Sequence, residues 1–149
     1  MSACFLLDVN ALVAMFWPAH AFHDATLKWF AREARREWAT CPFTQAGFVR
    51  IISNPAFSRD AVTPEEAARV LSANLEHRSH RVWPDAIGYV EAVKLFEGKL
   101  TGHRQITDAY LLGLAIQNNG KLATLDRAIP ALLPRERPHS ARIEMIVGK

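Results

Sequence analysis

The chain has 149 residues, of which half are hydrophobic and 22% are charged, with only seven glycines. This composition fits a folded domain with a sizeable core and excludes a disordered or low-complexity protein. The formal net charge of +3 permits a nucleic-acid partner without requiring one. We therefore expect a single domain that spans residues 1–149.

The N-terminal segment carries no pattern typical of secretion or of membrane insertion. Its apolar run has no basic region before it and is interrupted by Asp8 and Asn10, so it is far shorter than the roughly 20 residues of a membrane span. Cys4 and Cys41 lie in separate apolar runs, and we interpret them as small reduced side chains of the core, with incidental oxidation left open. We expect a cytoplasmic protein without membrane contact.

Short apolar runs alternate with amphipathic segments in the first half of the chain. Thr63 followed by Pro64 and two glutamates is a strong helix start, because it combines a capping hydroxyl with a proline in the first turn. The predicted elements of this half are a strand at 4–7, helices at 10–16 and 20–36, a strand at 38–41, a helix capped by Thr44 that runs to 52, and a helix at 64–75.

The second half continues the alternation. Its predicted elements are a strand at 81–83, a helix at 87–96, a helix from Asp108 to 119 capped by Thr107, a strand at 121–124, a loop at 130–138 and a strand at 142–147. Strands that alternate with helices favour an α/β fold in which one mostly parallel sheet is covered on both faces.

Three aspartates stand at positions where such a fold places its ligands. Asp8 directly follows the first strand, Asp126 lies just past the strand at 121–124, and Asp108 opens the helix before that strand. Open α/β sheets bind ligands beyond the carboxyl ends of their strands. If the three carboxylates converge, their mutual repulsion favours a hard cation such as Mg²⁺ or Mn²⁺, which suits the hydrolysis of a phosphodiester.

Each aspartate also has a purely structural interpretation. Asp8 can cap the following helix, Asp108 can interact with the dipole of its own helix, and Asp126 can be a turn residue or an ion-pair partner. For each aspartate considered alone, the structural interpretation is favoured over the functional one.

Three segments together resemble PIN-domain proteins, above all the VapC-type toxin ribonucleases of type II toxin–antitoxin pairs. They are Leu6–Leu12, Ile106–Leu112 and Leu122–Asp126. The segment Cys41–Ile51, continuing to Pro55, is similar to one branch of that group. The resemblance spans nearly the whole chain, and its motifs occur in the same order.

The resemblance implies a three-layer α/β/α sandwich with an acidic site. Asp8, Asp108 and Asp126 would surround Mg²⁺, for which Mn²⁺ is a substitute. Thr44 and Thr124 would support this site through their hydroxyl groups, and the side chain of Asn10 would steady its first loop.

The resemblance also implies a function. The chain would be an endoribonuclease that hydrolyses structured RNA, either tRNA or rRNA, and would act as the toxin of a toxin–antitoxin pair. Such toxins are typically homodimers neutralised by a cognate antitoxin protein. An apolar groove for the antitoxin is expected from the aromatic side chains of the first two helices, which are Phe16, Trp17, Phe22, Trp29 and Phe30.

One departure from the family concerns Gln45, because many PIN nucleases have a glutamate where this chain has glutamine. An amide is a weaker ligand than a carboxylate and cannot act as a base. We expect three carboxylates to suffice. The alternative is a catalytically silent PIN-like module that binds RNA or a protein.

Other residues have weaker claims. Arg50 belongs to a matched segment, and His103 and Arg104 precede Asp108, so we interpret all three as contacts to substrate phosphate, against the alternative of a solvated surface. The histidine pairs 20/23 and 77/80 lack a third ligand at zinc spacing. A phosphatase with Asp8 as nucleophile is disfavoured, because such enzymes generally need a second aspartate where this chain has Asn10.

Overall fold

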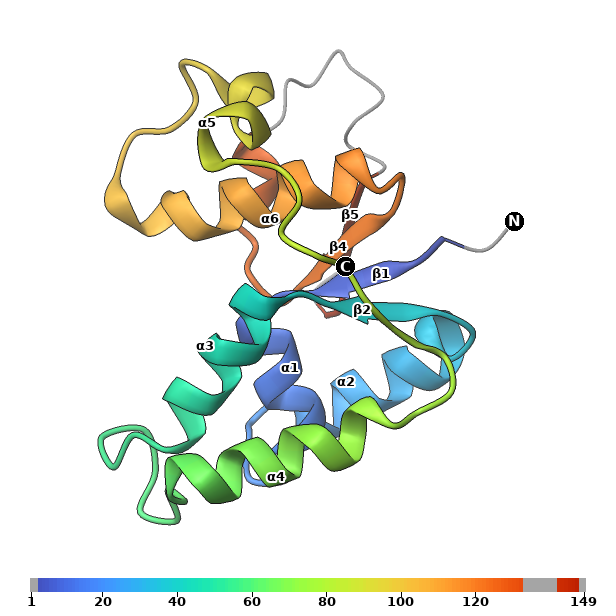
Figure 1. Cartoon of the computed structure of the whole chain (residues 1–149), viewed down its shortest axis with the longest axis vertical. Helices are drawn as coiled ribbons and strands as arrows, with labels where there is room; N and C mark the ends of the chain where they lie inside the picture. The colour runs from blue at the N-terminus through green and yellow to red at the C-terminus, as the bar shows by residue number, and fades with distance from the viewer. Residues whose placement is uncertain (1–2, 133–141, 148–149) are drawn as a thin grey trace.

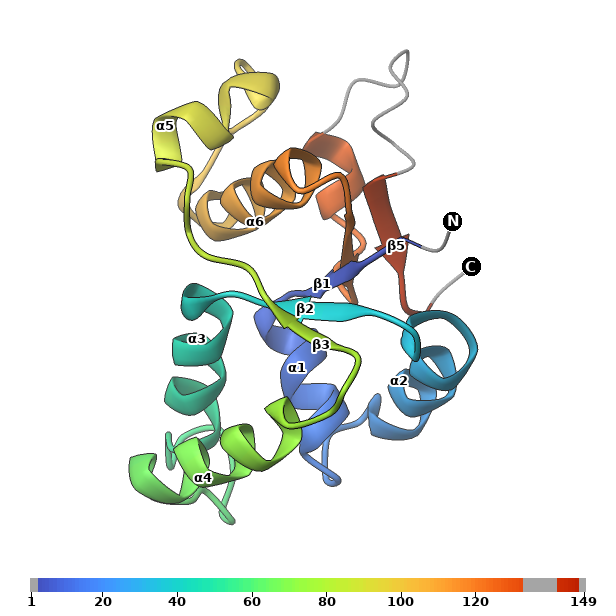
Figure 2. The same ribbon diagram turned by 45° about the vertical axis from the view of Figure 1, so that its right-hand side comes forward.

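The computed structural model of the chain describes residues 3–132 and 142–147. Five short strands form one sheet in the order β3-β2-β1-β4-β5, and every neighbouring pair is parallel. The strands are β1 (Phe5–Leu7), β2 (Trp38–Thr40), β3 (His80–Val82), β4 (Lys121–Thr124) and β5 (Ile143–Met145). Figure 2 shows β3 and β5 at the two edges of the sheet.

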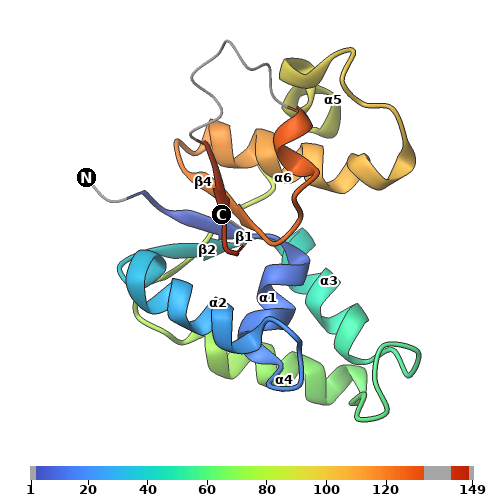
Figure 3. The same cartoon turned by 180° about the vertical axis from the view of Figure 1, so that it is seen from behind.

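Helices cover both faces of this sheet, as Figures 1 and 3 show from opposite sides. One layer contains α1 (Val9–Phe16), α2 (His23–Trp29), α3 (Pro42–Ile52) and α4 (Pro64–Leu75). The other contains α5 (Tyr89–Ala92) and α6 (Ile106–Gln117). The predicted three-layer α/β/α sandwich is therefore confirmed.

The core consists of two apolar clusters, one on each face of the sheet. Successive residues of a strand point to opposite faces, so Leu6 packs with α6 whereas Phe5 and Leu7 pack with the α1–α4 layer. Because both faces are buried, β1 is apolar throughout instead of alternating with polar residues.

The helix starts explain several features of the sequence. Thr63 caps α4 by accepting a hydrogen bond from the backbone N–H of Glu66 at 3.1 Å, as predicted. Thr44 does not cap α3, which begins earlier, at Pro42, because proline fits the first turn of a helix. The prediction that Thr107 caps a helix from Asp108 is also wrong, since α6 begins at Ile106.

The predicted helix at 87–96 is shorter than expected. Gly88 precedes its first residue, α5 ends at Ala92, and a 3₁₀ turn (Lys94–Phe96) follows. Gly98 adopts a positive φ of 81°, which glycine tolerates and which turns the chain away. α5 packs against the backbone of α6 so closely that a Cβ at Gly113 would lie 2.1 Å from the carbonyl oxygen of Ala92.

The second helix of the chain also differs from its prediction. Residues 20–22 precede it, and after α2 the chain continues as a π-helical turn (Phe30–Ala34) that ends before Arg36. Cys4 and Cys41 are free thiols in or beside the core, as expected.

Two further expectations concern the loop at 130–138 and the membrane. A 3₁₀ turn (Ile129–Leu132) occupies the start of that loop, and the remainder lies outside the described residues. In the part of the chain that the structure describes, no helix has the length and hydrophobicity needed to cross a bilayer.

Candidate active site

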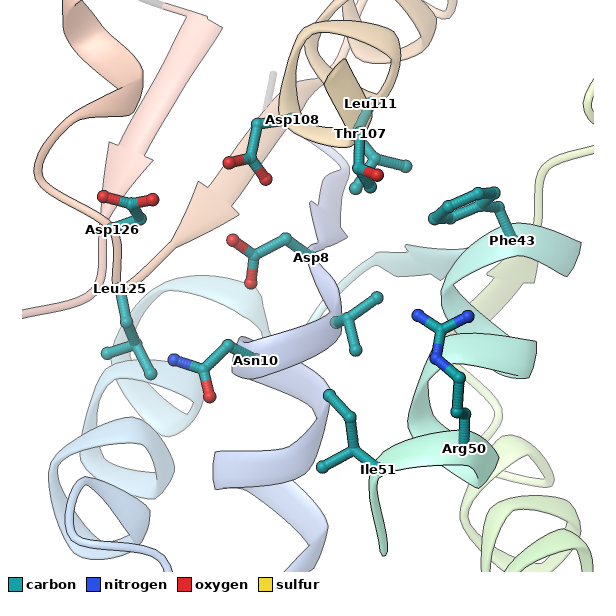
Figure 4. A pocket seen from close by; sticks show the side chains of 11 residues that line it. Asp8, Asn10, Phe43, Arg50, Ile51, Thr107, Asp108, Leu111, Leu125 and Asp126 are labelled. Carbon is teal, nitrogen blue, oxygen red and sulfur yellow. The ribbon is translucent and has the colours of Figure 1, made fainter. Parts of the chain in front are cut away.

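Asp8, Asp108 and Asp126 line one cavity of about 430 Å³. β1 and β4 are neighbours in register, with Leu7 opposite Ala123, so the residues that follow them emerge at the same edge of the sheet. Asp108 reaches this edge from the first turn of α6. Figure 4 shows the three carboxylates directed toward a shared space.

Asp8 is held in place by two hydrogen bonds, and its residue is only 5% exposed. One carboxylate oxygen accepts the backbone N–H of Ala11 at 2.8 Å, so Asp8 does cap α1. The other accepts the hydroxyl of Thr124 at 2.5 Å. The capping interpretation is correct, but it leaves the carboxylate facing the cavity, so both roles are compatible.

Thr124 links two of the aspartates. Its hydroxyl donates to Asp8 and accepts the backbone N–H of Asp126 at 2.9 Å. The Asp126 carboxylate in turn accepts the N–H of Ala128 at 2.8 Å, which fixes the turn after β4. The end of β4 therefore sets the distance between the two acidic residues through one buried hydroxyl group.

The electrostatics of the cavity favour a cation. Burial raises the pKa of Asp8 to about 7, against the opposing hydrogen bonds from Thr124 and Ala11, and the charges of Asp108 and Asp126 raise it further. Burial also raises the pKa of Asp108 to about 6, with a further contribution from Asp126. Both carboxyl groups hold their protons more tightly than usual, first because they are removed from water and second because neighbouring aspartates are also negative.

The three aspartates could provide only some of the ligands that Mg²⁺ needs. Within residues 3–132 and 142–147, no three histidine, cysteine, aspartate or glutamate side chains close around one point as a complete metal site would, and neither histidine pair forms a zinc site. Mg²⁺ is usually held by one or two carboxylates together with waters and substrate phosphates. An open cavity with three acidic residues matches that requirement.

Two other predicted site residues line the same cavity. Asn10 lies in α1, and its side-chain oxygen contacts Nε2 of His20 at 3.1 Å. Arg50 reaches the cavity from the last turn of α3 and is exposed to solvent. Arg50 brings a positive charge to an otherwise acidic cavity.

Four predicted site residues lie elsewhere. Thr44 is buried and exchanges hydrogen bonds with the backbone of Cys41 at the start of α3. Gln45 donates to the hydroxyl of Thr40 at 2.9 Å and does not line the cavity. His103 and Arg104 are exposed in the 3₁₀ turn (His103–Gln105) before α6, outside the cavity lining.

The position of Gln45 follows from helix geometry. Phe43 and Arg50 of α3 face the cavity, and Gly47 lies against Val9 on the same side. Residue 45 is two positions from both 43 and 47, which turns it to the opposite face of the helix. A glutamate at position 45 would therefore point toward β2 and not toward the aspartates.

Some lining residues were not singled out by sequence reasoning. Phe43 and Thr107 both border the cavity, and Thr107 had been interpreted only as a helix cap. Thr107 precedes Asp108 in a segment that resembles the family, so its position next to a predicted site residue could have identified it as a lining residue. For Phe43 the signal was an aromatic side chain directly after Pro42, at the start of a helix that the fold brings to the site.

Comparisons with known proteins identify the family of this chain. The PIN domain family model matches residues 5–132. The chain is 42% identical over 134 residues to ribonuclease VapC38 of Mycobacterium tuberculosis, covering 89% of this chain and 92% of that protein. It is 38% identical over 124 residues to ribonuclease VapC39 of the same species, covering 83% and 89%.

Among solved structures, the fold is similar to that of VapC20 of M. tuberculosis, described as a sarcin–ricin loop cleaving toxin. The TM-score is 0.60 at 12% identity, and the match covers 90% of this chain and 99% of VapC20. The family model, the VapC relatives and the fold all agree. The chain belongs to the PIN domain family and, within it, to the group of the VapC ribonucleases.

Proposed function

We propose that this protein is a Mg²⁺-dependent endoribonuclease that hydrolyses structured RNA, either tRNA or rRNA, and acts as the toxin of a toxin–antitoxin pair. The observation that carries the proposal is the convergence of Asp8, Asp108 and Asp126 in one cavity, where burial raises the pKa of Asp8 and of Asp108. Such a group of acidic residues gains most from a bound divalent cation, and such cations serve phosphodiester hydrolysis.

Each residue of the cavity has a defined task in this proposal. Asp8, Asp108 and Asp126 would hold Mg²⁺, or Mn²⁺ in its place. When bound, the cation supplies a more acidic water and neutralises charge on the phosphate. Thr124 keeps the Asp8 carboxylate turned toward the cavity through its 2.5 Å hydrogen bond.

The groups at the rim would position the RNA. Arg50 would bind a phosphate oxygen, because a guanidinium forms strong charge-assisted hydrogen bonds to phosphate. The amide of Asn10 contacts His20 and would steady the segment between α1 and α2, instead of a loop after β1, because α1 begins directly after Asp8. His103 and Arg104 are exposed just before α6, where they would contact the backbone farther along the strand.

The choice of structured RNA is supported by the relatives. VapC38 and VapC39 are ribonucleases, and VapC20 is described as cleaving a specific RNA loop. Recognition of a loop requires a protein surface that binds splayed, unpaired nucleotides. The cavity is open, so a loop that projects from a folded RNA would reach the aspartates.

The antitoxin partner and the homodimer are also proposed from the similarity to the VapC toxins. A toxin needs a partner that neutralises it. Of the five aromatic side chains predicted to form an apolar groove, Trp29 is buried in the core, whereas Phe22 is 45% exposed. Phe22 and Leu27 of α2 are exposed apolar side chains, and each would be available to contact a helix of the antitoxin or the second subunit.

The test is cleavage of total bacterial RNA by purified protein free of antitoxin, with Mg²⁺, with Mn²⁺ and with EDTA. We expect discrete fragments that require a metal and that disappear in Asp8→Asn and Asp108→Asn. Asp60→Asn is the matched control, because Asp60 is an exposed aspartate in the loop between α3 and α4. A folded protein that cleaves nothing with either metal would overturn the proposal.

No observation favours the catalytically silent module. Gln45 was its only support in the sequence, and Gln45 faces away from the aspartates. The phosphatase interpretation gains nothing either, because Asn10 lines the cavity as an amide and not as the second carboxylate that this chemistry needs.

A further inference from the structure

A second cavity, of about 310 Å³, adjoins the acidic one. It lies between the start of α3, the segment between β3 and α5, and the first turns of α6. Its walls are mostly aromatic and apolar, in contrast to the acidic cavity. Phe43 and Thr107 line both cavities, so the two are neighbours. Figure 4 shows these side chains on the side of the acidic cavity nearest α3 and α6.

Three aromatic rings form the walls of this second cavity. Tyr89 stacks on Tyr110 with 6.4 Å between ring centroids and 17° between the ring planes. Phe43 lies 6.4 Å from Tyr110 at a tilt of 50°. Phe43 is 39% and Tyr89 38% exposed, so both rings present apolar surface to solvent. Exposed aromatic rings beside a nucleic-acid site are platforms on which unpaired bases stack.

Asp85 is the charged residue among those that line this cavity, and it is exposed to solvent. Asp85 accepts the hydroxyl of Tyr110 at 3.1 Å, and within the described residues no other side chain donates a hydrogen bond to it. Its second oxygen is therefore available to an amino group. Adenine, cytosine and guanine each carry an exocyclic amino group that can donate to a carboxylate, whereas uracil has no amino group and offers only its ring N3–H.

An apolar protein segment would fit the cavity less well than a base. Burying the Asp85 carboxylate beneath an apolar side chain would leave a charge without compensation, which is costly. A base with an amino group covers the rings and pairs with the carboxylate at the same time.

From these contacts we propose that the cavity lined by Phe43, Tyr89, Tyr110 and Asp85 binds one unpaired base of the RNA substrate. The base belongs to a nucleotide next to the phosphate held in the acidic cavity, and Asp85 selects bases that carry an amino group. This inference rests on the proposed ribonuclease function, because it assigns a subsite of the same reaction.

The test measures RNA binding without cleavage. Fluorescently labelled single strands of about ten adenosines, cytidines or uridines are titrated with the protein in EDTA, and binding is followed by anisotropy. The variants are Phe43→Ala and Asp85→Asn. Their matched controls are Phe57→Ala, which removes an equally exposed ring (39%) from the segment between α3 and α4, and Asp60→Asn.

We expect Phe43→Ala to weaken binding of the adenosine and cytidine strands about tenfold, because removing one ring on which a base stacks typically weakens binding by roughly 5- to 150-fold. Asp85→Asn should reduce the preference for these strands over uridine while uridine binding stays unchanged. Both control variants should bind as the wild type does.

Two outcomes overturn the inference. One is equal binding of all strands by Phe43→Ala and Phe57→Ala. The other is a Phe43→Ala protein that changes its oligomeric state in gel filtration but keeps its RNA affinity, which would make the cavity a protein interface. If the wild type cleaves RNA but the cavity variants bind RNA as the wild type does, this inference alone is overturned. If the protein binds bases selectively but cleaves no RNA, the proposed reaction is overturned and the base site is retained.

Discussion

The two ends of the sheet carry opposite charges. At the carboxyl ends of β1 and β4, three aspartates share a cavity. At the opposite end, where the chain enters β2 and β3, a cavity of about 500 Å³ is lined by basic and hydroxyl side chains, which are Arg35, Arg36, His77, Arg78, Ser79 and Arg81. The two cavities are of similar size, so size does not distinguish them.

The difference lies in how the charges are held. Asp8 is buried, accepts two hydrogen bonds from the protein and has a pKa of about 7. The arginines of the basic cavity are exposed, and the ion pair of Arg81 with Glu37 is long, at 3.9 Å. Exposed charges are hydrated and need no ligand, whereas buried carboxylates without a counter-charge do. The acidic cavity is therefore where we place the chemistry.

The largest expected effect is that of Asp8→Asn on cleavage. Asparagine caps a helix as well as aspartate does, so the fold should be retained while a charged ligand is lost. We expect the rate of RNA cleavage to fall by about 10²–10³-fold, a loss typical of removing one group that stabilises charge in a transition state. The measurement is the rate constant with Mg²⁺, beside Asp60→Asn as control. A rate within twofold of wild type would place the chemistry elsewhere.

The next effect concerns stability against pH in the absence of metal. The pKa of Asp8 is about 7 and that of Asp108 about 6 in the folded chain, against 3.8 as the ordinary value. Between these values the folded state binds more protons than the unfolded state, so stability falls as pH rises and levels off above about pH 7.

We expect the free energy of unfolding in EDTA to drop by about 2–3 kcal/mol from about pH 5 to about pH 8 because of Asp8, at ~1.4 kcal/mol for each unit below its folded pKa. Urea denaturation at the two pH values measures the drop. In the Asp8→Asn variant, most of this decrease in the free energy of unfolding should be absent. An equal change of unfolding free energy with pH in wild type and variant would contradict the raised pKa of Asp8.

A smaller effect is expected for Thr124→Val, which keeps the shape of the side chain and removes its hydroxyl. The hydrogen bond from Thr124 lowers the pKa of Asp8, so its loss should raise that pKa and move the pH–rate profile of cleavage to higher pH. Stability should fall by about 1–3 kcal/mol because the N–H of Asp126 loses its acceptor. Thr124→Ser should restore the profile, which loss of packing alone would not explain.

The smallest effect is expected in the basic cavity. Arg35→Ala and Arg78→Ala remove exposed guanidinium groups far from the aspartates, so the maximal rate of cleavage should stay within about twofold of wild type. Any loss of RNA affinity should vanish as salt is raised. A large drop in the maximal rate would show that the two ends of the sheet act together.

The sequence predicted the sheet well because each buried strand is a short apolar run bounded by a helix breaker or a polar residue. β4, for example, ends where it was expected, at Thr124. The helix ends were harder, since Gly88 and the 3₁₀ turn after Ala92 shorten α5 through local backbone geometry that hydrophobic periodicity does not encode.

Some residues of the site could be predicted from the sequence pattern, and others could not. Asp8 and Asp126 follow strands, so the parallel sheet alone brings them to one edge, whereas Asp108 depends on where α6 begins and needed the family resemblance. Their roles as metal ligands stay a prediction. The pairing of Asp85 with Tyr110 could not be foreseen, because Asp85 lies in the irregular segment between β3 and α5, which has no periodic pattern, and the two residues are 25 positions apart.

The most direct test of the central claim is a titration of the EDTA-treated, dialysed protein with Mn²⁺ at about pH 8, with free Mn²⁺ followed by electron paramagnetic resonance. Wild type and Asp60→Asn should bind Mn²⁺ alike, and Asp8→Asn and Asp108→Asn should each bind it at least ~10-fold more weakly, since each lacks one charged ligand. Equal Mn²⁺ binding by wild type and both aspartate variants would contradict the assignment of the acidic cavity as a metal site.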